Sequence, residues 1–221
     1  MKRIGIVSGF GAAAGARLFS LLVKQCQMNG ARSDYDFPEV FLHNVRSKAM
    51  DQNGIANIET LKGDLATAVL DLEQLSAELI LIACNSAHVL HGWLQDQCRA
   101  RILDMVGLAI DAAAGATKIG VLSSRSTKLS GLYSRAIEAR GIVAITMTDE
   151  QQRFVDETIE RAISGTNPSS DRHELAGLVK TMVRAGAEAV ILGCTELPLT
   201  GIQSAYCIDP SQVMVEEALR L

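Results

Sequence analysis

Aromatic residues are scarce in this chain. They make up 4% of its 221 residues, with a single tryptophan. Proteins that bind single-stranded nucleic acid stack bases on aromatic side chains, so this composition disfavours such a surface. An excess of basic residues is missing too, because the formal net charge is −4. Nucleic acids and acidic membrane surfaces both require a basic face, and we therefore expect neither as a partner.

Long apolar runs are also missing, and none approaches the ~18–20 residues of a membrane-spanning helix. The cysteines match no zinc-binding or secreted disulfide spacing. The first residues, Met1–Arg3, lead directly into an apolar strand without the pattern of a signal peptide. These features predict a cytoplasmic protein with reduced thiols. The five cysteines are Cys26, Cys84, Cys98, Cys194 and Cys207.

What the chain does contain is an internal near-repeat. Residues Ala77–Asn85 and Ala187–Thr195 each begin with Ala-Glu, continue through apolar residues and one small residue, and end in a cysteine followed by a polar residue. The two segments lie 110 residues apart. A second similar pair, Ile4–Ser8 and Ile119–Ser123, lies 115 residues apart. Two pairs at nearly one offset indicate a chain built from two similar halves.

Each repeated apolar run is typical of a strand buried on both faces of a parallel sheet. Strand patterns alternate with helical periodicity along the chain, which predicts an α/β fold. We expect two domains, residues 1–103 with 209–221 and residues 104–208. Ligands bind outside the carboxyl ends of parallel strands. If a pseudo-two-fold axis relates the two sheets, Cys84 and Cys194 would line opposite walls of one cleft.

Helical periodicity places several helices between the strands. It predicts one helix over about 87–97, one over about 104–115, and one that begins near Leu129 and ends at Gly141. Free cysteine commonly packs as a small apolar residue. We therefore interpret as structural the three cysteines predicted inside elements, namely Cys26 and Cys98 in helices and Cys207 in a strand.

Cys84 and Cys194 are candidates for chemistry because each ends a buried strand at the same place in its half. The cytoplasmic prediction disfavours a disulfide between them. A catalytic zinc site would need His88 as a third ligand. A nucleophile with His88 as its base explains one cysteine but not the second. Acid–base chemistry on a carbon explains both, because a thiolate removes a proton from one face and a thiol returns one to the other.

The segments 83–88 (Ala-Cys-Asn-Ser-Ala-His) and 193–198 (Gly-Cys-Thr-Glu-Leu-Pro) resemble the paired cysteine motifs of the aspartate/glutamate racemase superfamily. The segments 4–11 and 208–210 are similar to parts of its aspartate racemase branch, and the resemblance spans nearly the whole chain. It implies two Rossmann-like domains around a central cleft, and commonly a homodimer. It also implies a racemase or epimerase that acts on acidic amino acids without a cofactor or metal. Cys84 and Cys194 would be its acid–base pair.

The chain departs from that family pattern in two places. An arginine that binds the substrate carboxylate is expected after the second strand, where this sequence has Asp51, with Arg46 and Lys48 upstream. A lysine of the branch is expected near the position of Ile163. Two alternatives stay open. One is a relative that acts on another small acid, such as a maleate isomerase or hydantoin racemase, and the other is a small-acid binding module without catalysis.

Candidate groups for binding an amino acid or another small carboxylate lie at the starts of helices. The small-residue turn after the first strand exposes backbone N–H groups, which suits an anion, and its spacing does not fit the dinucleotide-binding glycine pattern. N-capping by Ser123, Ser124 or Thr127 is a competing interpretation. His88 and Glu196 would either orient the thiols or lie on a helix surface. The predicted substrate-binding residues are Ser8, Gly9, Phe10, Gly11, Arg46, Gln52, Asn85, Ser86, Thr127 and Thr195.

Overall fold

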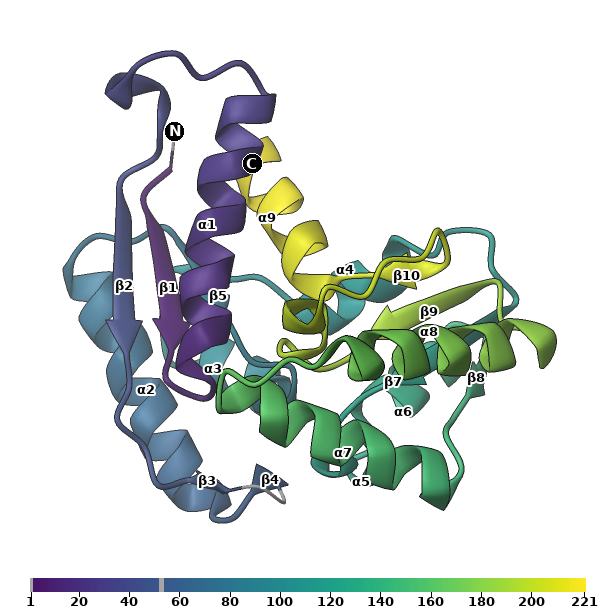
Figure 1. Cartoon of the computed structure of the whole chain (residues 1–221). Coiled ribbons are helices and arrows are strands. Elements are labelled where there is room, and N and C mark those ends of the chain that lie inside the picture. Colours follow the sequence, from purple (N-terminus) through teal and green to yellow (C-terminus); the bar gives the residue numbers. More distant parts are fainter. Residues whose placement is uncertain (1, 52–53) are drawn as a thin grey trace. The chain divides into compact units, whose positions relative to one another are not determined.

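The computed structural model describes residues 2–51 and 54–221 (Figure 1). Gln52, predicted to bind substrate, lies outside the described residues. The described chain divides into two compact units. Unit 1 contains residues 2–51, 55–105 and 211–221, and unit 2 contains residue 54 and residues 106–210. The domain boundaries predicted from the sequence remain a proposal for how the chain folds.

Unit 1 is built on a parallel sheet whose described strands follow the order β2-β1-β5-β6. Every residue of β1 and β5 is buried. This burial agrees with the unbroken apolar runs, because a strand covered by helices on both faces has no polar side. The strands are β1 (Ile4–Ser8), β2 (Val40–Asn44), β5 (Leu79–Ile82) and β6 (Arg101–Ile102).

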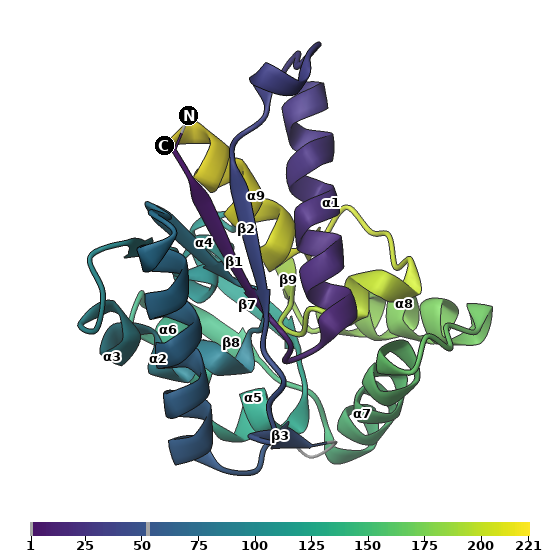
Figure 2. The same cartoon turned by 90° about the vertical axis from the view of Figure 1, so that its left-hand side faces the viewer.

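Helices cover both faces of this sheet (Figure 2). On one face lie α1 (Ala12–Met28) and α9 (Pro210–Arg220), which are joined by a hydrogen bond of 3.0 Å from Gln212 Nε2 to Gln25 Oε1. On the other lies α2 (Ile58–Gln74), with its leucines packed against β1 and β5. The shorter elements are the 3₁₀ helices η1 (Asp34–Asp36) and η2 (Ser86–Leu90), helix α3 (His91–Gln95), and the paired strands β3 (Met50–Asp51) and β4 (Gly54–Ile55).

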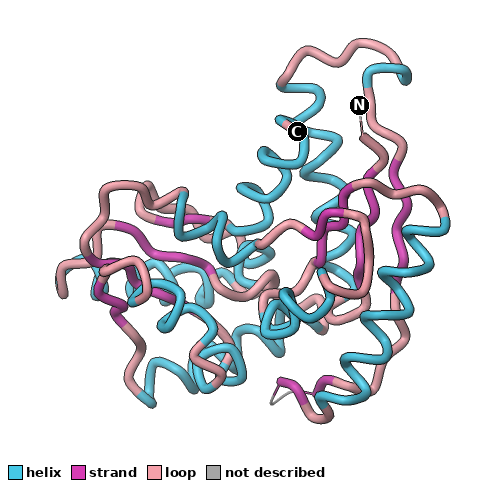
Figure 3. The backbone as a smooth tube through the Cα atoms, turned by 180° about the vertical axis from the view of Figure 1, so that it is seen from behind, coloured by secondary structure: helices cyan, strands magenta, loops and turns pink. Residues whose placement is uncertain are grey.

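Unit 2 has a second parallel sheet, whose described strands follow the order β8-β7-β9-β10. Helices α7 and α8 pack on one face, and α4 and α6 pack on the other. Figure 3 shows the alternation of strands and helices along the chain. The elements are α4 (Met105–Asp111), β7 (Lys118–Leu122), α5 (Arg125–Leu129), α6 (Leu132–Glu138), β8 (Val143–Ile145), α7 (Asp149–Ile163), α8 (Ser169–Arg184), β9 (Ala189–Leu192), η3 (Leu197–Thr200) and β10 (Cys207–Ile208).

The near-repeat extends into the packing of the two units. The two sheets share one strand order. If the four strands of each sheet are numbered along the chain, the second strand lies at one edge, followed by the first, the third and the fourth. A Cβ on Gly5 of β1 would lie 2.9 Å from Leu72 of α2, and a Cβ on Gly120 of β7 would lie 2.8 Å from Met182 of α8. In both units a glycine lets the helix before the cysteine strand approach the sheet. The predicted α/β fold with two similar halves is confirmed.

Several local predictions are wrong. The helix predicted over about 87–97 divides into η2 and α3 at Leu90, whose φ of −103° and ψ of 5° leave the helical region, and Cys98 lies beyond α3. The helix predicted to end at Gly141 is interrupted by Gly131, which adopts a left-handed φ of 64° between α5 and α6. The helix predicted over about 104–115 is confined to α4. No helix within the described ranges has the length and apolar character needed to cross a membrane.

Candidate active site

Cys84 lies at the carboxyl end of β5, separated from the strand by Ala83 alone. Cys84 is 6% exposed, and the predicted ligand-binding residues Asn85 and Ser86 that follow are also buried. Ala83 N donates to Val7 O at 2.9 Å, which ties this turn to the end of β1. The first candidate thiol therefore lies at the sheet edge where α/β proteins bind ligands.

The side chain of His88 contacts the backbone of the turn that contains Cys84. His88 is 4% exposed, and its ring has Nδ1 2.8 Å from the carbonyl oxygen of Cys84 and Nε2 3.4 Å from that of Leu103. Burial lowers the pKa of His88, which favours the neutral imidazole. A neutral ring protonated on Nδ1 donates to the Cys84 carbonyl. His88 thus positions the cysteine backbone, and its expected alternative place on a helix surface is wrong.

Cys194 occupies the corresponding place after β9 and is 9% exposed. Its Sγ donates to Glu196 Oε2 at 3.1 Å, and Thr195 Oγ1 donates to the same oxygen at 3.0 Å. Glu196 is 4% exposed, so a surface position for it is wrong as well. Burial raises the pKa of the Glu196 carboxyl, while the hydrogen bonds from Cys194 and Thr195 act in the opposite direction. The second thiol therefore has a buried carboxyl group as its partner.

The ends of β1 and β2 form the neighbouring part of the sheet edge in unit 1. Ser8 ends β1 and donates from Oγ to Oδ1 of Asn44, the last residue of β2, at 3.1 Å. Gly9 has a φ of 105°, and a Cβ there would lie 2.0 Å from the carbonyl oxygen of Val45. Only glycine fits such a position. Asn44 was not among the predicted site residues, although a polar residue that ends a strand is a usable signal.

The other candidates in unit 1 have different environments. Gly11 is the N-cap residue of α1, and no side chain caps that helix start. Phe10 is 9% exposed and packs into the core beneath α2, so its side chain contributes to packing. Arg46 and Lys48 are both exposed in the loop after β2. The structure thus places the turn after β1, Arg46 and Cys84 in loops at the carboxyl edge of one sheet.

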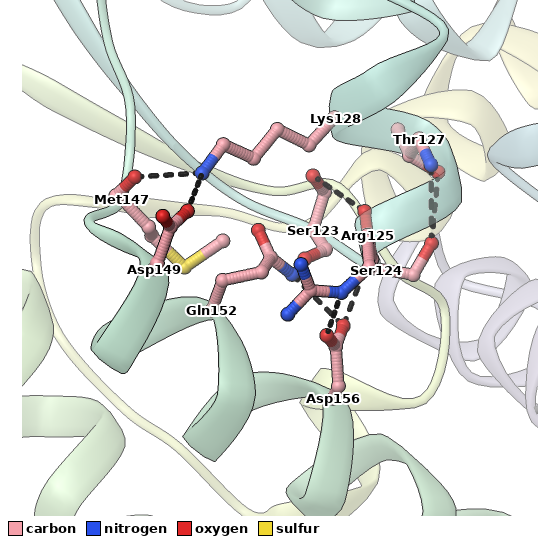
Figure 4. Close-up of polar contacts among 9 residues, drawn as sticks. All are labelled: Ser123, Ser124, Arg125, Thr127, Lys128, Met147, Asp149, Gln152 and Asp156. Carbon is pink, nitrogen blue, oxygen red and sulfur yellow. Dashed lines mark hydrogen bonds and ion pairs between the residues drawn. The ribbon is translucent and has the colours of Figure 1, made fainter. Parts of the chain in front are cut away.

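Thr127 lies buried in α5 of unit 2, near the end of β7. Ser124 caps this helix, because its Oγ accepts a hydrogen bond from Thr127 N at 3.3 Å. The two hydroxyl groups also bond to each other at 3.1 Å (Figure 4). The expected capping role is therefore present for Ser124, and it places the Thr127 hydroxyl beside the turn after β7.

Helix α7 holds this turn with two polar side chains that the sequence reasoning missed (Figure 4). Gln152 Nε2 donates to Ser123 O at 2.9 Å and to Asp156 Oδ1 at 2.8 Å. Asp156 also accepts hydrogen bonds from Arg125 N at 2.9 Å and Arg125 Nε at 3.1 Å. The available signal was a glutamine and an aspartate one helical turn apart beside the apolar positions of α7.

Each unit brings together the turn after its first strand and the cysteine after its third. In unit 2, Gly193 N donates to Leu122 O at 2.7 Å, and a Cβ on Gly193 would lie 3.2 Å from Ser123 Cβ. Among the described residues, no group of three or more His, Cys, Asp or Glu side chains is arranged to hold a metal ion. The site in each unit is thus a buried thiol beside helix starts and hydroxyl groups.

These features define an α/β protein with a thiol-containing turn repeated in two similar units. The family model described as Asp/Glu/Hydantoin racemase matches residues 7–218, so the chain belongs to that family. The family expected from the cysteine motifs is therefore confirmed.

Individual relatives agree with this assignment. The chain is 26% identical over 219 residues to the broad specificity amino-acid racemase RacX of Bacillus subtilis (strain 168). The aligned residues make up 97% of this chain and 95% of the relative. An aspartate racemase homologue from Pyrococcus horikoshii OT3 has a TM-score of 0.81 at 23% identity, with 100% of this chain and 98% of the homologue covered. The aspartate racemase of Picrophilus torridus has a TM-score of 0.79 at 21% identity, with 100% and 94% covered. These structures share the fold.

Proposed function

We propose that this protein is an amino-acid racemase, an isomerase that inverts the α-carbon of an amino acid with Cys84 and Cys194 as its acid–base pair. The observation that carries the proposal is the repetition of a buried thiol after the third strand of two sheets with the same strand order. Family membership supports racemisation. The name of the Bacillus relative favours an amino acid over the other small acids considered.

The chemistry needs one thiolate and one thiol. The thiolate takes the α-proton, so that the C–H bond breaks, an S–H bond forms and the electron pair stays on a planar carbanion. The second thiol then gives its proton to the opposite face, and the stereocentre is inverted. A thiol titrates near pKa ~8.5, close enough to neutral pH for both forms to be accessible. Because the two thiols exchange roles in the reverse reaction, two similar halves suit this function.

The substrate carboxylate would bind to uncharged donors at helix starts. Helix α1 has no side-chain cap, and the first N–H groups of a helix attract anions. Asn85, Ser86 and Thr195 add polar side chains directly after the two cysteines. Arg46 is an exposed cation in the loop after β2, and we assign it to the carboxylate or to an acidic substrate side chain. Thr127 completes the proposed set from unit 2.

We also infer that the protein works as a homodimer in the cytoplasm without a cofactor. The family resemblance supports the dimer, and the reduced thiols that the mechanism needs suit the cytoplasm. Light scattering during size-exclusion chromatography measures the mass directly. A mass twice that of the 23.7 kDa chain is expected, and a mass equal to that of one chain would contradict the dimer.

The experiment that tests the racemase is a screen for α-proton exchange. The purified protein is incubated in deuterated water with each amino acid, and loss of the α-proton signal and change of chirality are followed by NMR and chiral chromatography. At least one amino acid should racemise, and Cys84→Ser or Cys194→Ser should abolish racemisation. Cys98→Ser is the matched control, because Cys98 lies outside both cysteine turns. Full activity in either serine variant of the pair would contradict the proposal.

A further inference from the structure

Glu196 differs from an ordinary buried carboxyl group in what surrounds it. One oxygen, Oε2, accepts hydrogen bonds from both Cys194 Sγ at 3.1 Å and Thr195 Oγ1 at 3.0 Å. The other, Oε1, is buried and has no hydrogen-bond partner among the described residues. A buried polar atom without a partner is costly. A group retained at such a cost, in contact with a thiol, calls for a chemical explanation.

We propose that Glu196 is the proton acceptor of the Cys194 thiol. The S–H bond breaks, its electron pair stays on sulfur, and an O–H bond forms on the Glu196 carboxyl group. The resulting Cys194 thiolate is the form that can remove a substrate α-proton. This inference rests on the proposed racemase function, in which Glu196 touches the thiol but not the substrate.

The surroundings of Glu196 favour this transfer. Helices α7 and α8 pack against η3, which follows Glu196. Their partly buried charges are paired among themselves and with α5: Arg161 Nε lies 2.8 Å from Asp171, and Asp156 lies 3.1 Å from Arg125 Nε. Burial raises the pKa of Glu196 and so brings its proton affinity nearer to that of a thiol, whose pKa is ordinarily ~8.5. Transfer therefore costs less than it would to an exposed carboxylate.

The first half of the chain lacks this arrangement in its sequence. Ser86 stands two residues after Cys84, where Glu196 stands two residues after Cys194. A serine hydroxyl does not hold a second proton at neutral pH. His88, the titratable group nearest along the chain, directs its ring nitrogens at the carbonyl oxygens of Cys84 and Leu103. The two thiols should therefore ionise differently, and only Cys194 should depend on Glu196.

The test measures how each thiol ionises, without substrate. Iodoacetamide alkylation of Cys84 and Cys194 is followed across pH by peptide mass spectrometry of the full-length protein. A thiol that shares a proton with a carboxyl group titrates in two steps, so Cys194 should show two steps in the wild type. Glu196→Gln should leave one step, at a lower pH than the upper step of the wild type, because the amide carries no negative charge beside the sulfur. The profile of Cys84, in the same molecule, should not change.

Glu188→Gln is the matched control, because Glu188 is a carboxylate at the start of the same strand that bonds to Thr117 instead of the thiol. It should leave the Cys194 profile unchanged. Thr195→Val is a second variant for the case in which Glu196→Gln does not fold. It removes one donor from the carboxylate, so the lower step should move to higher pH. Identical Cys194 profiles in the wild type and Glu196→Gln, or an unmoved lower step in Thr195→Val, would overturn the inference.

Activity provides an independent readout. General acid–base assistance contributes about 10²–10⁴-fold to rates, so Glu196→Gln should lower kcat by at least about 10²-fold. The loss in kcat/KM must be equal in both directions, because the equilibrium constant of racemisation is one. A wild type that racemises no amino acid would contradict the proposed function even with a two-step Cys194 profile. An active wild type with one-step ionisation would contradict only the role of Glu196.

Discussion

At the scale of single residues, the two cysteine turns differ in the titratable group beside each thiol. Cys84 has the His88 ring against its carbonyl oxygen, and Cys194 has the Glu196 carboxyl group against its sulfur. Burial disfavours the charged form of both groups, so it lowers the pKa of His88 and raises that of Glu196. Charging either group therefore lowers the free energy of unfolding. For His88 this happens as the pH falls, and for Glu196 as the pH rises.

His88 makes the protein sensitive to acid. Its pKa in the folded state lies below the ordinary value of 6.5, so the unfolded chain binds the proton more readily. This contribution to stability is present above pH 6.5 and is lost as the pH falls below it. His88→Asn keeps a donor for the Cys84 carbonyl but cannot titrate. Urea unfolding between about pH 7.5 and pH 5 should therefore show a smaller loss of stability in this variant than in the wild type.

The matched control is His173→Asn, because His173 is exposed on α8. It should lose as much stability in acid as the wild type does. An undiminished acid-induced loss in His88→Asn would show that another group carries the effect.

Ser76 is a second residue with a measurable consequence. It adopts a left-handed φ of 64°, while Gly186, at the equivalent place 110 residues later, has a φ of 100°. Left-handed backbone costs a residue with a side chain about 1–2 kcal/mol, whereas glycine adopts it freely. Ser76→Gly should raise the free energy of unfolding by up to about 1 kcal/mol, after the greater freedom of glycine in the unfolded chain is subtracted.

The reciprocal variant, Gly186→Ser, should lower the free energy of unfolding, and chemical denaturation measures both changes. Equal destabilisation by the two substitutions would show that the positions are not equivalent.

The sequence was sufficient to identify both cysteines as candidates, because each ends an apolar run and the pattern occurs twice. It was not sufficient to place Glu196. Glu196 lies in the turn between β9 and η3, where a side chain can face the solvent or the core, and here its carboxyl group is buried against the thiol. Phe10 was predicted to contact the substrate because of its neighbours in the sequence; its ring packs in the core, and a substrate contact by this residue stays a prediction.

At the scale of elements, helix α7 positions the turn that follows β7. Gln152 and Asp156 join it to Ser123 and Arg125, which begin the segment leading into α5 (Figure 4). A turn without regular hydrogen bonds of its own takes its conformation from such side chains. The position of Thr127 in the proposed site therefore depends on helix α7, which begins only at Asp149, after α6 and β8.

Asp156→Ala should destabilise the protein by about 2 kcal/mol, because it removes the acceptor of three hydrogen bonds, from Arg125 N, Arg125 Nε and Gln152 Nε2. Chemical denaturation measures this change. Glu157→Ala removes the adjacent carboxylate, which is 65% exposed and lies 3.8 Å from Arg161, and should cost less than about 1 kcal/mol. Equal effects of the two substitutions would mean that α7 does not hold the turn.

Elements with strong periodicity were predictable, and short ones were not. Helix α7 shows an apolar face and a capping box in which Thr148 and Gln151 bond to each other's backbone, and both features are visible in the sequence. The division between α5 and α6 depends on the left-handed conformation of Gly131. Glycine permits that conformation but does not require it, so apolar spacing alone favoured one continuous helix.

At the scale of the whole molecule, the internal repeat is the strongest link between sequence and function. Both units use one strand order, and both place a small residue and a cysteine after the third strand. The repeat can be recognised from the sequence because equivalent positions need the same residue type. Gly5 and Gly120, for example, each lie where a side chain would collide with a helix of the same unit. The segment with Arg46 and Asp51 lies outside the repeat, so the pattern shared by the two main sheets does not predict its conformation.

The measurement that tests the two-thiol account most directly is deuterium incorporation from solvent into each pure enantiomer by the single serine variants. Each thiol would reach one face of the α-carbon, so each variant would keep one thiol able to abstract a proton. Cys84→Ser and Cys194→Ser should each incorporate deuterium into one enantiomer only, and their preferences should be opposite. The same preference in both variants, or unchanged racemisation in either, would contradict the account.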